Sequence, residues 1–243
     1  MADPKLLAEL APTGALRAAI NMGNFLLVTG KTPAGEPAGV SPSIAAAIAE
    51  RLGVPLKLVP YARPGEIADD AGKGLWDIAN IGAEPQRAQQ IYFTAAYCEI
   101  EATYLVPAGS PIKAIAEVDQ PGKRIAVTAR SAYCLWLENN LKHAQLLQSD
   151  NAEAALRQFR EEKLDAYAGL RPGLISEAAK MPGSCILEGQ FAAVQQAVGT
   201  AKTNILASNF LHDFVEEAKR NGLVASFIEQ HGVVGRLSVA PPA

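Results

Sequence analysis

The sequence predicts an α/β fold in two units, each with a central, mostly parallel sheet flanked by helices. Strand-like and helix-like segments alternate in a β-α-β-α-β order over residues 16–87, which favours parallel strands joined by crossover helices. The same character returns after a turn-rich break at residues 107–122. The 243 residues are enough for one large or two small domains, and 49% of them are hydrophobic.

The first half begins with an expected short buried strand at residues 16–20. Residues 41–53 predict a helix with Ser41 as its N-cap and Gly53 as its left-handed stop, because apolar residues recur there every four positions. The remaining expected elements are a strand at 55–60, a helix opening near 63–65, a strand at 76–81 and a short helix that carries Arg87.

The second half is expected to start with a strand at residues 123–127. Ser131 and Asn151 are predicted N-caps of the two helices that follow, which run to about residues 141 and 163. A short strand is expected at 165–168, and a final pair of helices near Ser208 and Leu223, closed by Gly222 and Gly232.

Composition and charge exclude several classes of protein. The apolar content is too high for a disordered chain, and a net charge of -3 argues against a nucleic-acid partner. No run of about 20 apolar residues is present to span a bilayer. These features predict a soluble globular protein.

Cysteine and histidine usage predicts no metal site. The three cysteines lie far apart, their odd number leaves at least one free thiol, and no zinc spacing is present. The three histidines are also scattered, each in a segment that we expect to be helical and at the surface.

The first twenty residues contain no secretory signal, because charged residues and a proline interrupt every apolar run. Two explanations stay open: either the protein is cytoplasmic, or Met1 was added to a mature exported form. The chain also lacks the GxSxG, GxGxxG, Walker and HExxH patterns. The sequence therefore assigns no catalytic residue and no cofactor.

The most informative segment is residues 81–97, which read IGAEPQRAQQIYFTAAY. This segment resembles the signature of the bacterial solute-binding proteins of family 3, which has a strand, a turn and a short helix with an early arginine. The Phe-Thr-Ala-Ala-Tyr that follows the helix is also similar to that signature. Weaker matches, which occur in the same order as in the family, extend this resemblance over nearly the whole chain. They lie at residues 16–21, 37–43, 74–78, 122–127 and 164–168.

This family comprises the amino-acid-binding components of ABC importers. The resemblance implies the type II periplasmic binding-protein fold, with a ligand cleft between two lobes that close on a solute. The implied first lobe is residues 1–103 with 200–243, and the second is 104–199, with crossing strands near 101–105 and 196–200. It also implies a monomer that works with a membrane permease, in the periplasm after removal of a signal; the cytoplasmic alternative holds if Met1 is native.

On this resemblance Arg87 takes the place of the arginine that grips a ligand carboxylate, a task that suits the paired donors of a guanidinium. The other expected ligand-binding residues lie where matched strands end or where a helix begins. They are Asn21, Asn24, Arg63, Asn80, Gly82, Arg130, Ser131, Ala132, Tyr133, Gly169 and Arg171.

Departures from the family pattern indicate the kind of ligand. Leu170 stands where the family usually has the acid that holds a ligand ammonium, Asn21 replaces an acid at the first strand, and Glu84 replaces a threonine. The matched positions also include Arg63, Arg130 and Arg171. Because an unpaired buried ammonium is costly, we expect an organic anion rather than a standard amino acid.

Several alternatives stay open at this point. Arg130 and Arg171 would not serve if their side chains point outward, and Glu84 or Glu99 could supply the missing acid. A cyclohexadienyl dehydratase-like lyase on the same scaffold would use Glu84 as its proton donor. A ligand-sensing module is the third reading.

Overall fold

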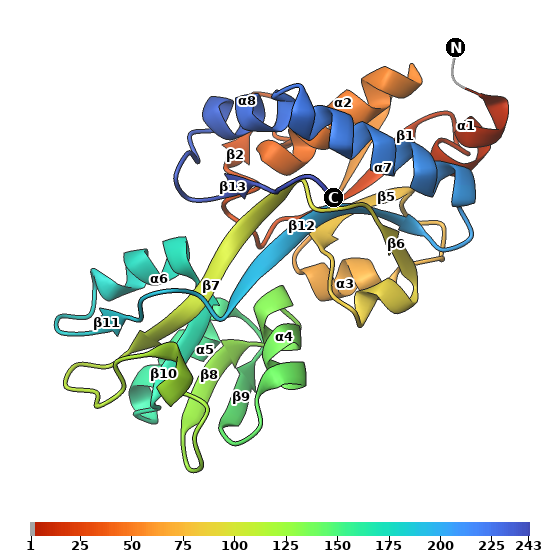
Figure 1. Ribbon diagram of the computed structural model, residues 1–243. Helices are drawn as coiled ribbons and strands as arrows, with labels where there is room; N and C mark the ends of the chain where they lie inside the picture. The colour runs from red at the N-terminus through yellow and green to blue at the C-terminus, as the bar shows by residue number, and fades with distance from the viewer. Residues whose placement is uncertain (1–2) are drawn as a thin grey trace. The chain divides into compact units, whose positions relative to one another are not determined.

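The computed structural model describes residues 3–243 and forms two compact units (Figure 1). Unit 1 consists of the residues up to Glu99 together with Gln195–Ala243, and unit 2 is Ile100–Val194. Both boundaries fall a few residues before those expected from the sequence. Among residues 3–243, none of the helices combines the length and apolar character that crossing a membrane requires.

Unit 1 contains a sheet in which β1 lies between two parallel neighbours, β4 and β5, and β12 runs antiparallel to β5. Two short strands extend this sheet, since β6 pairs with β12 and β13 pairs with the start of β7. The strands β2 and β3 form a separate two-stranded ribbon. The bounds are β1 Leu16–Asn21, β2 Gly30–Lys31, β3 Pro37–Ala38, β4 Leu56–Tyr61, β5 Ile78–Gly82, β6 Ile91–Phe93, β7 Cys98–Val106, β12 Ala192–Ala201 and β13 Ser238–Val239.

Helices cover both faces of this sheet. In Figure 1, α2, α7 and α8 lie together on one side of the sheet, whereas α3 lies on the other. The bounds are α1 Pro4–Leu10, α2 Val40–Leu52, α3 Pro64–Asp69, the 3-10 helix η1 Arg87–Gln89, α7 Ile205–Arg220 and α8 Leu223–Gln230. Ala79 and Ile81 of β5 pack with Ile67 of α3, so the alternation along a strand turns Asn80 to the opposite face.

The start of α2 differs from the prediction. The helix begins at Val40 with Gly39 as its N-cap, because the chain passes so close to Leu27 that a Cβ at position 39 would overlap the Leu27 carbonyl. Ser41 therefore lies inside the first turn, and its Oγ is 3.0 Å from the hydroxyl of the buried Tyr97. The predicted end is correct, since Gly53 adopts the left-handed conformation with φ 71°.

Unit 2 contains a sheet in the order β7, β10, β8, β9. β8 is parallel to both of its neighbours, and β10 and β11 run antiparallel to β7. The bounds are β8 Arg124–Thr128, β9 Gln145–Ser149, β10 Ala166–Leu170, β11 Cys185–Ile186, η2 Ile115–Glu117, α4 Ala132–Asn140, α5 Ala152–Glu161 and α6 Arg171–Ala178. Both predicted N-caps form: Ser131 Oγ accepts from the Cys134 amide, and Asn151 Oδ1 accepts from the Ala154 amide.

Other expectations were incomplete. The helix expected near Ser208 begins at Ile205, where the Glu9 carboxylate accepts a hydrogen bond from the Ala207 amide at 2.7 Å. The sequence did not predict α1, α6 and β9, nor the short strands β2, β3, β6, β11 and β13. Contrary to the prediction, His143 lies between α4 and β9 and His231 follows α8 as its C-cap, so of the three histidines His212 lies within a helix, α7.

Candidate ligand-binding site

The expected site residues of unit 1 gather where β1 and β5 end. The two strands are parallel neighbours with Ile20 opposite Asn80, so their carboxyl ends lie at the same edge of the sheet. This edge is where open α/β sheets place their ligands. The residues that follow each strand are therefore candidates for contact with a solute.

Arg87 is held firmly at this edge. Its side chain comes from η1, the residue is 5% exposed, and Nη1 donates a hydrogen bond to the Gly82 carbonyl oxygen at 2.8 Å. A guanidinium carries five N–H groups in a rigid fork, so this bond orients the whole fork while using one of them. The last carbonyl of β5 thus sets the direction in which Arg87 presents its charge.

Glu84 lies three residues before Arg87 and is 8% exposed. Burial raises the pKa of its carboxyl group above the ordinary value, and the positive charge of Arg87 opposes this rise. A carboxyl group in a residue buried to this extent is uncommon, which makes Glu84 an unusual group of the edge.

Asn21 and Asn24 stabilise the loop that follows β1. Asn21 Oδ1 accepts from the Gly23 amide at 3.1 Å, and Asn24 Oδ1 accepts from the Leu26 amide at 3.2 Å. These bonds are those of residues that shape their own turn. The structure therefore gives each asparagine a local role, and contact with a solute stays a prediction.

Asn80 has a different environment. The residue is 1% exposed, and neither its Nδ2 nor its Oδ1 finds a hydrogen-bond partner in the described part of the chain. Leaving a buried amide unpaired costs about 1–3 kcal/mol. Asn80 is therefore a destabilising feature of the fold.

Arg63 is the N-cap residue of α3 and forms an ion pair with Glu66. Its Nη2 lies 3.0 Å from Glu66 Oε1, and its backbone amide donates to the same carboxylate. The arrangement stabilises the first turn of α3. The charge of Arg63 is thus largely compensated within unit 1.

In unit 2, the candidates Arg130, Ser131, Ala132 and Tyr133 mark the start of α4. Ser131 Oγ donates to the Thr128 carbonyl at 2.8 Å while accepting from the Cys134 amide, which fixes the turn. Arg130 is exposed and adopts a positive φ of 59°. Burial raises the pKa of the Tyr133 hydroxyl, so this group stays neutral over the physiological range.

The end of β10 carries the remaining candidates. Gly169 allows a close approach, since an added Cβ would lie 3.0 Å from Leu174 Cδ2. Leu170 packs against an apolar cluster that includes Ala102 and Ala132. Arg171 forms an ion pair with Glu101 and donates to the carbonyl oxygens of Leu187 and Gly189.

These contacts revise the expected charge of the site. The sequence indicated a local excess of arginine, but Arg63 and Arg171 each have a carboxylate partner of their own. Glu84, which the sequence gave only as an alternative, lies beside Arg87; its signal was an acid in place of the family's threonine.

Residues 24–233 match the sequence profile of the bacterial extracellular solute-binding proteins, family 3. The chain belongs to this family. A search of curated proteins found no match. The family assignment therefore rests on the profile, which covers most of the chain.

Several solved structures share the fold. A mutant of ArgBP from T. maritima aligns with a TM-score of 0.73 at 19% identity, covering 93% of this chain and 99% of that one. The S. pneumoniae protein AbpA, bound to L-arginine, gives 0.72 at 18% identity, covering 91% and 96%. An ancestral amino acid-binding protein described as a precursor of cyclohexadienyl dehydratase gives 0.72 at 20% identity, covering 92% and 97%. At these identities the likeness establishes the type II periplasmic binding-protein fold.

Across residues 3–243, no group of three or more His, Cys, Asp or Glu side chains is arranged to hold an ion. The three cysteines are free thiols, with Cys98 and Cys134 buried and Cys185 exposed.

Proposed function

We propose that this protein is the solute-binding component of an ABC importer, and that it binds a small carboxylate-bearing solute between its two units, which close on it. Arg87 is the residue we assign to the ligand carboxylate. Its orientation by the Gly82 carbonyl supports this role, because a fork held in place loses less entropy when it binds.

The ligand is proposed to be an organic anion rather than a standard amino acid. The single observation that carries this is Leu170, an apolar side chain packed among Ala102, Ala132 and Val194 where the family resemblance expects an acid. An ammonium buried against this cluster would lose its hydration without gaining a counter-charge. The neighbouring acid Glu101 is engaged by Arg171.

The other acids of unit 1 do not readily replace the missing one. Glu99 accepts a hydrogen bond from Gln195 Nε2 at 2.7 Å. Glu84 is buried and burial raises its pKa, so keeping it ionised as the counter-charge of an ammonium is costly. Both features favour a ligand without a free α-amino group.

A thermal-shift screen tests this proposal, because a ligand that binds the native state raises its melting temperature. The panel is acetate, lactate, succinate and benzoate against L-arginine, L-lysine and L-glutamine, followed by calorimetry on each compound that gives a shift. We expect shifts with acids and none with the amino acids. Tight binding of an amino acid with inert organic acids would refute the anion proposal, whereas no shift with any compound would count against solute binding altogether.

A second candidate is an elimination reaction on the same scaffold, favoured by the raised pKa of Glu84, which suits a general acid. Incubation with a cyclohexadienyl carboxylic acid, followed by ultraviolet absorbance of an aromatic product, tests it. The Glu84→Gln variant should lose turnover if Glu84 is the proton donor. Full turnover in that variant would exclude the role.

The proposed partners follow from importer function. We place the protein outside the inner membrane with a membrane permease as its partner, as a monomer and without nucleic acid. A ligand-sensing role would use the same site with another protein partner. Co-purification of the permease with the tagged protein separates the two readings.

A further inference from the structure

A serine and a histidine from distant parts of the chain meet on the surface of unit 1. Ser43 lies at the end of the first turn of α2, and His231 is the C-cap residue of α8. Ser43 Oγ is 2.8 Å from His231 Nε2, and both residues are partly buried. A serine hydroxyl within hydrogen-bond reach of an imidazole nitrogen is the arrangement in which a histidine activates a nucleophile. The two positions are 188 residues apart, so no sequence motif indicates the pair.

The environment of His231 favours the protonation state that a base needs. Burial lowers the pKa of His231 below the ordinary 6.5, so its imidazole is neutral at neutral pH. In the tautomer that carries its proton on Nδ1, Nε2 accepts the hydrogen bond from the Ser43 hydroxyl. The charged residues that line the adjoining groove are Glu50 and Arg51, one and two turns further along α2, and Arg51 is paired with Glu217. His231 is thus available to take the hydroxyl proton.

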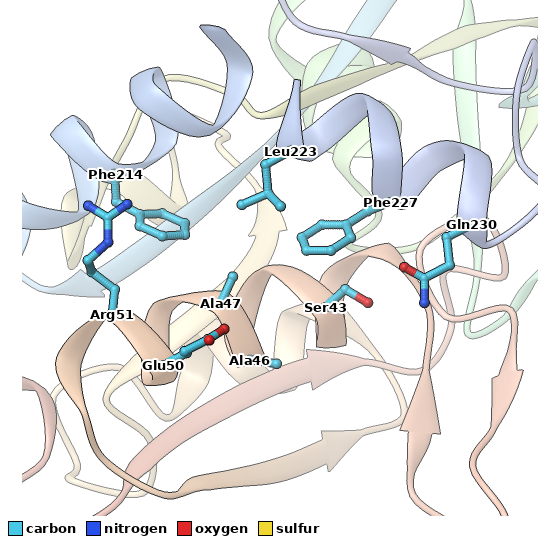
Figure 2. Close-up of a pocket in the computed structure, with 9 residues that line it drawn as sticks. All are labelled: Ser43, Ala46, Ala47, Glu50, Arg51, Phe214, Leu223, Phe227 and Gln230. Atoms are coloured by element: carbon cyan, nitrogen blue, oxygen red, sulfur yellow. The ribbon is translucent and has the colours of Figure 1, made fainter. Parts of the chain in front are cut away.

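The groove beside Ser43 offers room for a small substrate. Its volume is about 720 Å³, and small-molecule sites ordinarily measure about 300–1,000 Å³. Figure 2 shows Gln230 beside Ser43 at one end of the groove, and Phe227 between Ser43 and Leu223. The apolar residues that line it are Ala46, Ala47, Phe214, Leu223 and Phe227. A nucleophile, an amide donor and an apolar wall therefore share one cavity.

We propose that Ser43 and His231 form a second site in unit 1, which hydrolyses small uncharged esters. Ser43 Oγ attacks the ester carbonyl carbon while His231 Nε2 takes the hydroxyl proton. The bond from this carbon to the alcohol oxygen then breaks, and His231 returns the proton to that oxygen. Water, giving a proton to the same imidazole, attacks the acyl group on Ser43, and the serine recovers its proton as the carboxylic acid leaves. Gln230 is assigned as the donor to the carbonyl oxygen, where negative charge develops.

The lining of the groove indicates why the ester should be small and uncharged. An acyl chain or an aromatic alcohol can pack against Leu223 and Phe227, which favours apolar groups on both sides of the ester bond. An anionic substrate would lie near the exposed acid Glu50, and the charge of Arg51 is already matched by Glu217 at 2.9 Å. This chemistry differs from the binding of an organic anion at Arg87, and the two sites share no residue.

Hydrolysis of p-nitrophenyl acetate and p-nitrophenyl butyrate, followed by the absorbance of nitrophenolate, measures the activity. Ser43→Ala and His231→Gln should each lower the rate by about 100-fold, the contribution of a positioned base to such a step. The matched controls are Ser226→Ala and His212→Gln, which change an exposed serine of α8 and an exposed histidine of α7 and should keep the wild-type rate. Melting temperatures establish that all four variants fold.

A covalent label identifies the nucleophile. Phenylmethylsulfonyl fluoride should sulfonylate Ser43 as Oγ displaces fluoride and the hydroxyl proton passes to His231, and mass spectrometry of the digested protein locates the adduct. We expect one adduct, on Ser43, and none in His231→Gln. The wild-type rate of ester hydrolysis should also fall as the pH is lowered through the pKa of His231, below 6.5.

The possible outcomes decide the proposal without touching the solute site. An unchanged rate in Ser43→Ala would show that other surface nucleophiles cleave the ester, and the proposal would fail. An adduct at another residue, or no adduct at all, would equally overturn it. Loss of hydrolysis in both variants together with an adduct on Ser43 supports it. Binding of organic acids at Arg87 is measured separately by thermal shift, so either function can fail while the other stands.

Discussion

Arg17 on β1 and Asp77 at the start of β5 form a double contact: Nη2 lies 2.6 Å from Oδ1, and Nε lies 3.0 Å from Oδ2. The Arg17 backbone amide also donates to Oδ2 at 2.8 Å. Asp77 is 4% exposed, so its charge depends on these donors. The pair therefore fixes how β1 and β5 lie side by side, and with them the edge that carries Asn80 and Arg87.

We predict that Asp77→Asn lowers the free energy of unfolding by about 3 kcal/mol, because it leaves Arg17 without its counter-charge. Glu217→Gln is the matched control. It removes the carboxylate of the exposed Arg51–Glu217 pair and should cost about 0.5 kcal/mol. Urea unfolding measures both, and equal effects would show that burial does not govern the strength of these pairs.

Arg87→Met should weaken binding of the organic acid that gives the largest thermal shift by about 100-fold or more, since a charge-assisted bidentate contact is lost. Arg63→Gln should change the affinity by less than about threefold, because Arg63 already pairs with Glu66. Calorimetry measures both. A larger loss with Arg63→Gln than with Arg87→Met would mean that the carboxylate binds near α3.

Asn80→Leu should raise the free energy of unfolding by about 1 kcal/mol, because an apolar side chain of similar size relieves an unpaired buried amide. If Asn80 contacts the solute, the same variant should bind it more weakly. Unfolding and calorimetry on one preparation report both effects. A loss of stability would show that the amide has a partner, such as a buried water molecule.

Stability should also fall in mild acid because of His231. Its Nε2 lies 2.8 Å from Ser43 Oγ, and burial lowers its pKa below the ordinary 6.5. The unfolded chain then binds a proton more readily than the native one, so this contribution is present above pH 6.5 and is lost as the pH falls towards the lower native value. His231→Gln should remove this dependence in urea unfolding between about pH 7 and about pH 5; an unchanged slope would contradict it.

The same contact lies at one end of a surface groove of about 720 Å³ between α2 and the last two helices (Figure 2). Ser43 and Gln230 line that end, and Arg51 and Phe214 line the other. Because His231 ties the end of α8 to α2, a loosened contact at low pH would first affect this groove. Hydrogen exchange of the α8 amides, measured with the urea series, follows that change.

Local signals were enough to predict much of the fold. The caps Ser131 and Asn151 work within one turn of chain, so their residue types predict the helices that they start. The start of α7 could not be predicted this way, because its cap is the Glu9 carboxylate, distant in sequence. Similarly, Ser41 resembles a cap, but the approach of Leu27 places the cap at Gly39.

The candidate site was less predictable than the fold. The resemblance selected Arg87, whose anchoring to Gly82 follows from the short turn between them. Charge pairing could not be read from the sequence: Glu101 and Arg171 meet because β7 and the end of β10 are neighbours in the sheet. The unusual state of Glu84 also depends on burial, which the residue type alone does not reveal.

The discontinuity of unit 1 has a consequence during synthesis. All of unit 2 precedes Gln195, whereas unit 1 still lacks the greater part of β12 and all of α7 and α8 at that point. A ribosome-bound chain of this length would hold a complete unit 2 and a unit 1 sheet with one edge uncovered and one face lacking α7 and α8. We therefore expect unit 2 to reach protease resistance first, and chaperone contacts on nascent chains to concentrate on the strands of unit 1 until α7 has emerged.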